Sequence, residues 1–319
     1  MLTIDTHWVW DSWYAEHEGL HHAFFLHAPR ALGDPHARHH QARVGHATSP
    51  DLTSWVVHEP ALEPSLHPSW DDQAIWTGCV VRGPGDQWLM YYTGISRADN
   101  AEVQRIGIAT STDLHTWTRL GDAPVSEADP RWYETDPTRT VDGVAWRDPW
   151  VFKAEDGRWH MLITASAAGQ PAETGGVIGH AVSDDMVGWT ALPPLTVPGG
   201  RRCLEVPQVA HIDGQHVLVF SAPRAETEND PLPLGDVWAA PAAGPLGPYD
   251  IEAAWPVDDT GLYAGRLVEG SPGEWALMGF INVQDDDFLG AIADPRPLER
   301  HTVRVAAPDD MPHQTVLDR

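Results

Sequence analysis

One short segment recurs along the chain, and this repetition limits the possible folds more than any other feature of the sequence. It reads GHATSPDLTSW at residues 45–55, GIATSTDLHTW at 107–117 and GHAVSDDMVGW at 179–189. Weaker copies are VWAAPAAGPLGPY from Val237 and GAIADPRPL from Gly290. Each copy joins a short strand to a Ser, Asp or Pro turn, and most add an aromatic residue. Repeats of this length, with several short strands each, are typical of β-propeller blades.

A second, independent pattern also indicates five units. Ahead of each recurring segment lie a short apolar strand, a turn that contains glycine and another apolar strand. The turn glycines are Gly19, Gly85, Gly157, Gly214 and Gly273. No comparably long 3.6-residue periodicity competes with these strands. The sequence therefore predicts an all-β fold in which residues 1–319 form a single five-bladed β-propeller, with four-stranded antiparallel blades and a central pocket.

Acidic residues recur at one place in this register. Asp148 and Glu205 lie nine residues before the glycines of their turns, and Asp11 lies eight residues before its glycine. Trp76 and Ala264 hold the same place in the other two units. Because the first strand of each propeller blade lines the central channel, these five positions are expected to converge around the axis. Carboxylates are costly to desolvate unless they are paired or used, so three at matching positions indicate an active site.

Three converging acids are the groups that glycoside hydrolysis requires. One ionised carboxylate attacks the anomeric carbon or orients a water molecule towards it. A second group, whose pKa its surroundings raise, protonates the leaving oxygen. A third carboxylate holds sugar hydroxyls and stabilises the developing positive charge. The sixteen tryptophans of the chain are also suited to sugar binding, because their rings are flat and amphipathic.

The motifs around the three acids resemble those of the invertase and levansucrase clan of glycoside hydrolases. VWDSW at residues 9–13 is similar to the nucleophile motif of levansucrases, and WRDP at 146–149 to the Arg-Asp-Pro motif of both groups. LEVPQV at 204–209 resembles their Glu-x-Pro acid/base motif, and WTG at 76–78 lies where invertases place a substrate loop. The clan has a five-bladed propeller, in agreement with the repeats. Invertases add a C-terminal β-sandwich, which is not expected here.

The resemblance implies a role for each acid in a retaining mechanism. Asp11 is expected to be the nucleophile that forms a fructosyl-enzyme ester, and Glu205 the acid/base, with their carboxyls about 5–5.5 Å apart. Asp148 is expected to hold the furanose hydroxyls, while Arg147 offsets negative charge and donates hydrogen bonds. The implied activity is exo-type hydrolysis of small fructose-containing oligosaccharides, as in β-fructofuranosidases, with transfructosylation left open.

Further residues near the acids are expected to contact the sugar: Trp76, Trp10, Thr77, Gln73 and Trp13. Trp76 is the favoured aromatic platform. Because side chains alternate along a strand, Trp10 and Asp11 are expected to face opposite ways. Three tryptophans that share one place in the repeats are expected in the blade cores: Trp55, Trp117 and Trp189.

Histidines at five positions do not match a zinc-binding pattern: His21, His22, His36, His39 and His40. We expect this segment to be a solvated loop that borders the pocket. Catalysis of this type requires no metal and no cofactor, so none is expected. Further acids are expected in exposed loops: Glu226, Glu228, Asp285, Asp286 and Asp287.

The formal charge of −26 is spread along the chain, which argues against nucleic acid or anionic membranes as partners. The sequence opens without a basic and apolar leader, and no apolar run approaches the length of a membrane span. A cytoplasmic location is therefore expected. The two cysteines are too few for a disulfide framework. The sequence does not predict an oligomeric state.

Two other functions remain open at this point. Arabinofuranosidases and β-xylosidases also use five-bladed propellers with two aspartates and one glutamate, although the Arg-Asp-Pro motif favours fructose. A non-catalytic sugar-binding propeller is the second alternative, and the complete set of three acids argues against it.

Overall fold

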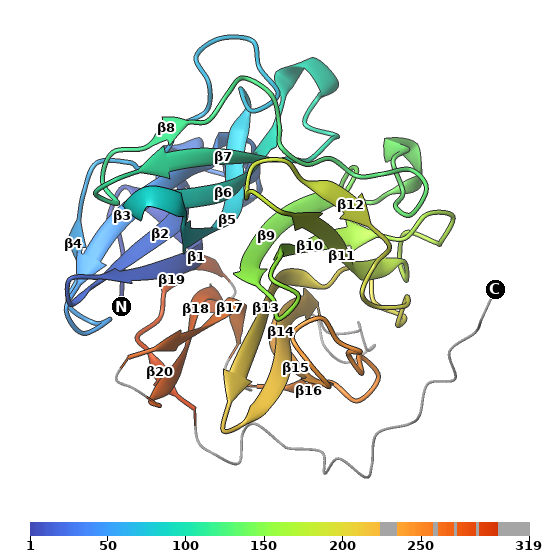
Figure 1. The fold of residues 1–319 in the computed structure, drawn as a ribbon. Coiled ribbons are helices and arrows are strands. Elements are labelled where there is room, and N and C mark those ends of the chain that lie inside the picture. Colours follow the sequence, from blue (N-terminus) through green and yellow to red (C-terminus); the bar gives the residue numbers. More distant parts are fainter. Residues whose placement is uncertain (224–234, 258–260, 271–272, 285–286, 299–319) are drawn as a thin grey trace.

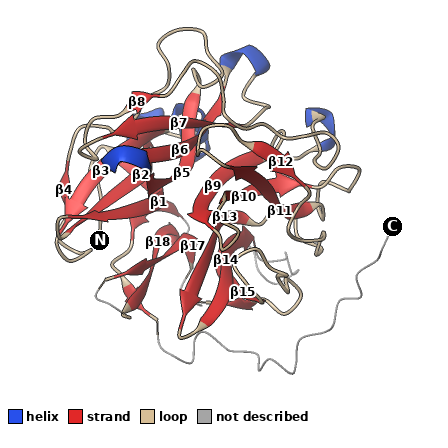
Figure 2. Ribbon diagram, viewed as in Figure 1, coloured by secondary structure: helices blue, strands red, loops and turns tan. Residues whose placement is uncertain are grey.

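Five antiparallel sheets stand around a common axis in the computed structural model, which describes residues 1–223, 235–257, 261–270, 273–284 and 287–298 (Figure 1). Each sheet has four strands, and the helices in the described ranges are short 3-10 segments (Figure 2). The predicted all-β, five-bladed propeller is therefore confirmed. None of the helices in those ranges has the length and hydropathy of a membrane span.

The strands follow one another through the blades in chain order. Blade 1 holds β1 (His7–His17), β2 (Leu20–Pro29), β3 (Arg43–Ser49) and β4 (Val56–Val57), and blade 2 holds β5 (Ala74–Arg82), β6 (Trp88–Ile95), β7 (Arg105–Ser111) and β8 (Thr118–Arg119). Blade 3 holds β9 (Trp146–Lys153), β10 (Trp159–Ser166), β11 (Gly176–Ser183) and β12 (Thr190–Leu192), and blade 4 holds β13 (Glu205–Ile212), β14 (Gln215–Pro223), β15 (Gly235–Ala242) and β16 (Trp255–Pro256). Blade 5 holds β17 (Leu262–Glu269), β18 (Trp275–Gln284), β19 (Asp287–Ile292) and β20 (Arg296–Pro297), and β20 pairs with β18.

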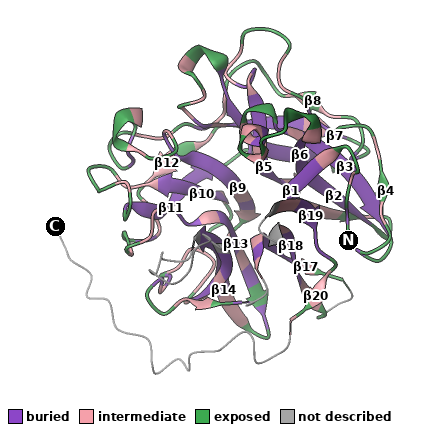
Figure 3. Ribbon diagram, turned by 180° about the vertical axis from the view of Figure 1, so that it is seen from behind, coloured by how far each residue is buried: buried purple, intermediate pink, exposed green. Residues whose placement is uncertain are grey.

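The first strand of each blade is the innermost one, as predicted. β1, β5, β9, β13 and β17 each stand at one edge of their sheet and lie against the first strands of the neighbouring blades. Buried residues follow these strands and their pairing partners (Figure 3). Trp55, Trp117 and Trp189 are half-buried and pack against buried clusters, which confirms their role in packing. The Trp55 ring contacts Tyr14 of its own blade, whereas Trp117 packs on Phe24 of blade 1 and Trp189 on Tyr91 of blade 2.

Each innermost strand contains a β-bulge at an equivalent place. The register shift begins after one residue in each strand: Trp10, Trp76, Arg147, Glu205 and Tyr263. The next residue opens the bulge: Asp11, Thr77, Asp148, Val206 and Ala264. Pro149 and Pro207 stand second in their bulges, where they are not paired in the ladder. Since an innermost strand has a sheet partner on one side only, the missing N–H of each proline costs no ladder hydrogen bond.

Contacts between blades 1 and 5 close the ring. Leu2 N donates to Ile292 O over 2.9 Å, and Ile292 N donates to Leu2 O over 3.1 Å. The Arg30 guanidinium adds a hydrogen bond of 2.9 Å to Leu289 O. These bonds hold the first and last blades together, so that the innermost strands of all five blades face one axis.

Trp13 belongs to the core of blade 1, where it is 1% exposed and stacks on Phe24. We expect Trp13→Ala to lower the free energy of unfolding by about 3–5 kcal/mol, because the truncation removes a large buried ring and leaves a cavity. Urea unfolding measures this difference. Trp132→Ala is the matched control, because Trp132 is 37% exposed and its loss should change stability by less than about 0.5 kcal/mol. Equal effects of the two substitutions would contradict the assignment of Trp13 to the core.

Candidate active site

A pocket of about 470 Å³ opens at one end of the axis, and Asp11, Asp148 and Glu205 all line it. Its volume lies within the range of small-molecule sites. All five residues that precede the bulges contribute to its wall, and so do four of the five residues that open them. The structure thus brings together the three acids that the sequence placed around the axis. Their chemical roles remain predictions.

The acids do not share a single equivalent position, which corrects the register taken from the sequence. Asp11 and Asp148 open their bulges, whereas Glu205 lies one residue earlier and matches Arg147. The cause is the length of the hairpin loops. A two-residue turn joins β1 to β2 and β13 to β14, but five residues separate the last paired residues of β9 and β10. Nine residues before the turn glycine therefore stands the residue that precedes the bulge in blades 1, 2 and 4, but the residue that opens the bulge in blades 3 and 5. Asp11 lies eight residues before its glycine, so the count placed it together with Glu205 in error.

The expectation that Trp10 and Asp11 face opposite ways is wrong, because both line the pocket. The bulge interrupts the alternation of side chains, and Asp11 has a φ of 21°. Asp148 has a φ of 58° in the equivalent position, and there too the preceding residue, Arg147, lines the pocket. A bulge re-aims side chains in this way, so the innermost strands of blades 1 to 4 each present two consecutive residues to the cavity, whereas blade 5 presents Tyr263 without Ala264.

Hydrogen bonds fix Asp148 at the bottom of the site, where it is 3% exposed. Its Oδ2 accepts from Thr164 Oγ1 over 2.8 Å and from Val206 N over 3.2 Å. Its own backbone N–H donates to Thr93 Oγ1 over 3.0 Å. The Arg147 Nε lies 3.6 Å from the same Oδ2. The carboxylate is therefore held rigidly by blades 2, 3 and 4.

Glu205 is held by two donors from neighbouring blades. Arg147 Nη2 donates to Glu205 Oε1 over 2.5 Å, and the Tyr263 hydroxyl donates to Oε2. Arg147 is itself fixed by a bond of 3.0 Å from its Nη1 to Gln104 Oε1. Tyr263 was not predicted from the sequence. Its equivalence to Trp10, Trp76, Arg147 and Glu205 in the bulge register is the signal that would have identified it.

The expected roles require an ionised Asp11 and a protonated Glu205, but the electrostatic environment gives Asp11 the higher pKa of the two. Burial and the nearby Asp148 carboxylate raise the pKa of Asp11 to about 7, although the Thr77 hydroxyl, which donates to Asp11 Oδ2, opposes the shift. Burial alone would raise the pKa of Glu205, but Arg147 and the Tyr263 hydroxyl outweigh it and hold that pKa below its usual value. Burial and the Glu205 charge raise the pKa of Asp148 despite Arg147. In the pocket without ligand, Asp11 holds a proton more strongly than Glu205.

A loop from blade 1 forms one wall of the pocket. It is the 3-10 segment η2 (Pro35–Gln41), whose Arg38, His39 and His40 line the cavity. Trp76 Nε1 donates to His39 O over 2.7 Å, and the Arg38 guanidinium lies 5.4 Å from the Trp10 ring. His39 and His40 border the pocket as predicted, but His36 does not line it. The prediction is wrong for His21 and His22, which are buried on strand β2. Arg38 was missed, because sequence alone does not show which loop residues turn towards the axis.

Two predicted sugar contacts are wrong, because neither Gln73 nor Trp13 lines the pocket. The side chain of Gln73 donates to His40 O over 2.8 Å and so supports the loop from behind. Trp13 lies in the core, because strand alternation resumes after the bulge and turns it away from the axis. Trp76, Trp10 and Thr77 do line the cavity. Glu226, Glu228, Asp285 and Asp286 lie outside the described residues, as does the side chain of Asp287.

Arg266 crosses the axis behind the acids. It is 1% exposed, and its Nη1 donates to Pro207 O over 2.7 Å and to Val206 O over 3.2 Å. Its Nη2 lies 3.4 Å from its acceptor Gly78 O, on the opposite blade. Burial lowers the pKa of Arg266 to about 10, so the group is still a cation at neutral pH. A separate hollow of about 190 Å³, lined by Arg266 and Trp150, lies beyond it.

Comparisons with known proteins agree with this geometry. The model of the glycosyl hydrolases family 32 N-terminal domain matches residues 11–293. An insoluble β-fructofuranosidase isoenzyme of Arabidopsis thaliana, CWINV6, is 29% identical over 196 residues, which cover 60% of this chain and 32% of that protein. The chain spans about a third or less of the length of the curated relatives it matches.

Solved structures share the fold. The Bombyx mori family 32 β-fructofuranosidase BmSUC1 superposes with a TM-score of 0.68 at 19% identity, covering 92% of this chain and 62% of its own. The inulosucrase of Halalkalicoccus jeotgali, solved with kestose, has a TM-score of 0.69 at 22% identity, covering 91% of this chain and 80% of its own.

The raised pKa of Asp11 predicts a pH-dependent cost in stability. The folded pKa of about 7 lies above the usual value of 3.8 for an aspartate, so the folded state binds this proton more tightly than the unfolded state. The contribution of this proton to the free energy of unfolding is fully present below about pH 4 and is lost as the pH rises through 7. We expect Asp11→Asn to match the wild type at pH 4 and to exceed it by a few kcal/mol at pH 8, at about 1.4 kcal/mol per pKa unit. Urea unfolding at both pH values tests this, and equal stability at pH 8 would contradict the shift.

Proposed function

The chain belongs to glycosyl hydrolase family 32, and we propose that it releases terminal fructofuranosyl residues from small oligosaccharides by a retaining mechanism. The observation that carries this proposal is the convergence of Asp11, Asp148 and Glu205 in one pocket of a family 32 propeller. The names of the plant and insect relatives, both β-fructofuranosidases, support a fructoside substrate for this chain as well. Family membership favours this substrate class over arabinofuranosides and xylosides.

The closed floor of the pocket supports exo-type action. Arg266 bridges β17 to β13 and β5 directly behind the acids, so an oligosaccharide cannot pass along the axis. A chain end that enters from the open side therefore places its terminal ring among Asp11, Asp148 and Arg147. The Trp76 ring, which lines the cavity and is fixed through its Nε1, supplies an apolar face for that ring.

The proposed reaction has two steps. Asp11 attacks the anomeric carbon as the bond to the leaving oxygen breaks, and Glu205 gives its proton to that oxygen. Water then loses a proton to Glu205 and attacks the same carbon, which frees Asp11 and returns the sugar with its original configuration. Thr164 and Val206 hold Asp148 by hydrogen bonds to its Oδ2, so this carboxylate is suited to hold the furanose hydroxyls and to stabilise the developing positive charge. An acceptor sugar in place of water would give transfructosylation.

Catalysis requires that the proton held by Asp11 move to Glu205. Three acids beside Arg147 titrate as a coupled group, so their pKa values belong to the cluster. A form with ionised Asp11 and protonated Glu205 carries the same number of protons as the favoured form and differs only in proton position. We infer that substrate binding favours this form, because the leaving oxygen accepts a hydrogen bond only from protonated Glu205.

This arrangement predicts a bell-shaped dependence of kcat/KM on pH, with a basic limb near 7 from the raised pKa of Asp11. Tyr263→Phe removes a hydrogen bond that stabilises ionised Glu205, so the pKa of Glu205 should rise. We expect the acidic limb to move to higher pH in this variant while the basic limb stays near 7. Initial rates on sucrose across the pH range measure both limbs. An unchanged acidic limb would contradict the role of the Tyr263 hydroxyl.

Substitution of the acids tests their roles directly. We expect Asp11→Ala to lower kcat by about 10⁴-fold or more and Glu205→Gln to lower it by about 10²–10⁴-fold, with the fold intact by circular dichroism. Glu274→Gln, which alters an exposed acid of blade 5, is the control and should keep wild-type activity. Near-normal turnover by Asp11→Ala would rule out its role as nucleophile.

A substrate panel separates the proposed activity from the alternatives. Sucrose, short inulin and levan oligomers, an aryl α-arabinofuranoside and an aryl β-xyloside are incubated with the protein, and NMR follows the first anomer released. Hydrolysis of the fructosides with retention supports the proposal, whereas initial inversion would exclude a covalent intermediate on Asp11. Sugar binding without turnover of any substrate would favour a non-catalytic propeller.

A further inference from the structure

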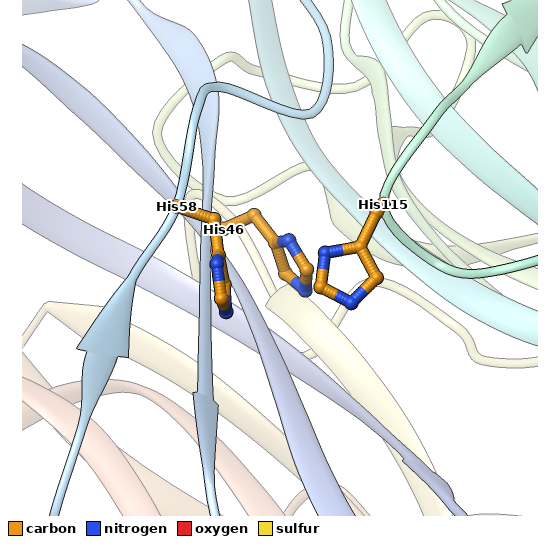
Figure 4. Close-up of side chains that lie close together, drawn as sticks. All are labelled: His46, His58 and His115. Carbon is orange, nitrogen blue, oxygen red and sulfur yellow. The ribbon is translucent and has the colours of Figure 1, made fainter.

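Four histidines gather at the junction of blades 1 and 2, away from the pocket. His22 lies on β2, His46 on β3, His58 after β4, and His115 in the turn between β7 and β8. Three of them point towards one another (Figure 4): the ring centroid of His46 lies 4.9 Å from that of His58 and 4.7 Å from that of His115. One ring nitrogen from each of these three lies within 4.8 Å of the others. They arrive from three distant segments, so no short sequence spacing reveals them.

The hydrogen bonds around the inner histidines leave nitrogens available at the centre of the group. His46 is 1% exposed, and its Nε2 lies 3.0 Å from His22 Nδ1. Its Nδ1 is buried without a hydrogen-bond partner among the described residues. His58 Nε2 lies 2.8 Å from Thr48 Oγ1. If both Nε2 atoms carry the proton and donate it, the Nδ1 lone pairs are free, which is the arrangement of histidines that bind metal ions.

Blade 3 provides an internal comparison. His160 and His180 repeat the stacked pair of His22 and His46, with Nδ1 of the first 2.9 Å from Nε2 of the second. The residue paired with His180 on the outer strand is Leu192, whereas His58 donates its backbone N–H to His46 O. The stacked pair is therefore a feature of the repeat, but the additional His58 and His115 are particular to the junction of blades 1 and 2.

We propose that His46, His58 and His115 bind one divalent transition-metal ion, with Zn²⁺ as the best fit, which cross-links blades 1 and 2. Imidazole nitrogens suit Zn²⁺, Cu²⁺ and Ni²⁺. Zn–N bonds of about 2.0–2.1 Å in a tetrahedron place ligand nitrogens about 3.4 Å apart, so the three rings must close by roughly 1 Å. The exposed His115 side chain can make this adjustment, and water completes the tetrahedron.

The charge around the group favours a cation. The Asp113 carboxylate is near enough to act on both His46 and His22. None of the four histidines lines the active-site pocket, so the ion would be structural and not catalytic.

Zinc binding by the whole chain tests this proposal. Protein treated with a chelator is dialysed against buffered Zn²⁺ and its metal content is measured. We expect one equivalent in the wild type and at least about tenfold weaker binding in His115→Ala, an exposed position whose loss should leave the fold intact. His211→Ala is the matched control, because His211 forms a separate pair with His216 on blade 4 and should not affect the site.

Thermal unfolding gives a second readout that does not depend on activity. Zn²⁺ should raise the unfolding temperature of the wild type and of His211→Ala, and should leave that of His115→Ala unchanged. Co²⁺ should give the visible absorption of a tetrahedral site only where His115 is present. Unaltered zinc affinity in His115→Ala, loss of binding in His211→Ala, or no bound zinc in the wild type would each overturn the proposal.

Discussion

The innermost strand of every blade has a hydrogen-bonded partner on one side only, and the active site depends on this unpaired edge. A central strand tolerates neither an extra residue nor a proline without loss of ladder bonds, whereas an edge strand tolerates both. Every innermost strand here contains a bulge, and two of the bulges contain proline. Asp11 and Asp148 adopt positive φ at these bulges, a conformation that costs about 1–3 kcal/mol each and persists because the neighbouring blades hold the side chains.

The bulges also explain why so much charge can converge at the axis. Four of the five blades present two consecutive residues to the cavity, so acids and their partners occupy adjacent positions in a small space. Arg147 and Glu205 hold equivalent positions on neighbouring strands and meet as an ion pair. Arg266 lies one layer further along the axis and remains a cation at neutral pH. Burial and the nearby Asp148 carboxylate nevertheless raise the pKa of Asp11 to about 7, so ionisation of this group lowers stability as the pH rises through 7.

The sequence predicts those features that depend on repetition. Five units, their strand order and the convergence of Asp11, Asp148 and Glu205 follow from a common register, because equivalent positions in a propeller surround one axis. The direction of side chains next to a bulge cannot be predicted from this register, since one extra residue reverses the alternation of side chains along the strand. For this reason Trp10 was predicted to face away from Asp11, and Trp13 was placed among the sugar contacts. Tyr263 becomes predictable only once the bulge register replaces the count from the turn glycines.

The repeats do not predict the features by which the blades differ from one another. The loop that carries Arg38 and His39 (residues 30–42) is longer than the loop at the same place in blade 2 (residues 96–104), and it reaches the pocket by packing against Trp10 and Trp76. The histidine group, away from the pocket, is also a place where one blade differs from the others. A buried pair that the fold repeats in blade 3 gains two further histidines in blade 1, one that follows its own outer strand and one from the neighbouring blade. The repeated bulges thus supply the acids of the pocket, whereas the loop of Arg38 and the histidine group are additions at blade 1 and its junction with blade 2.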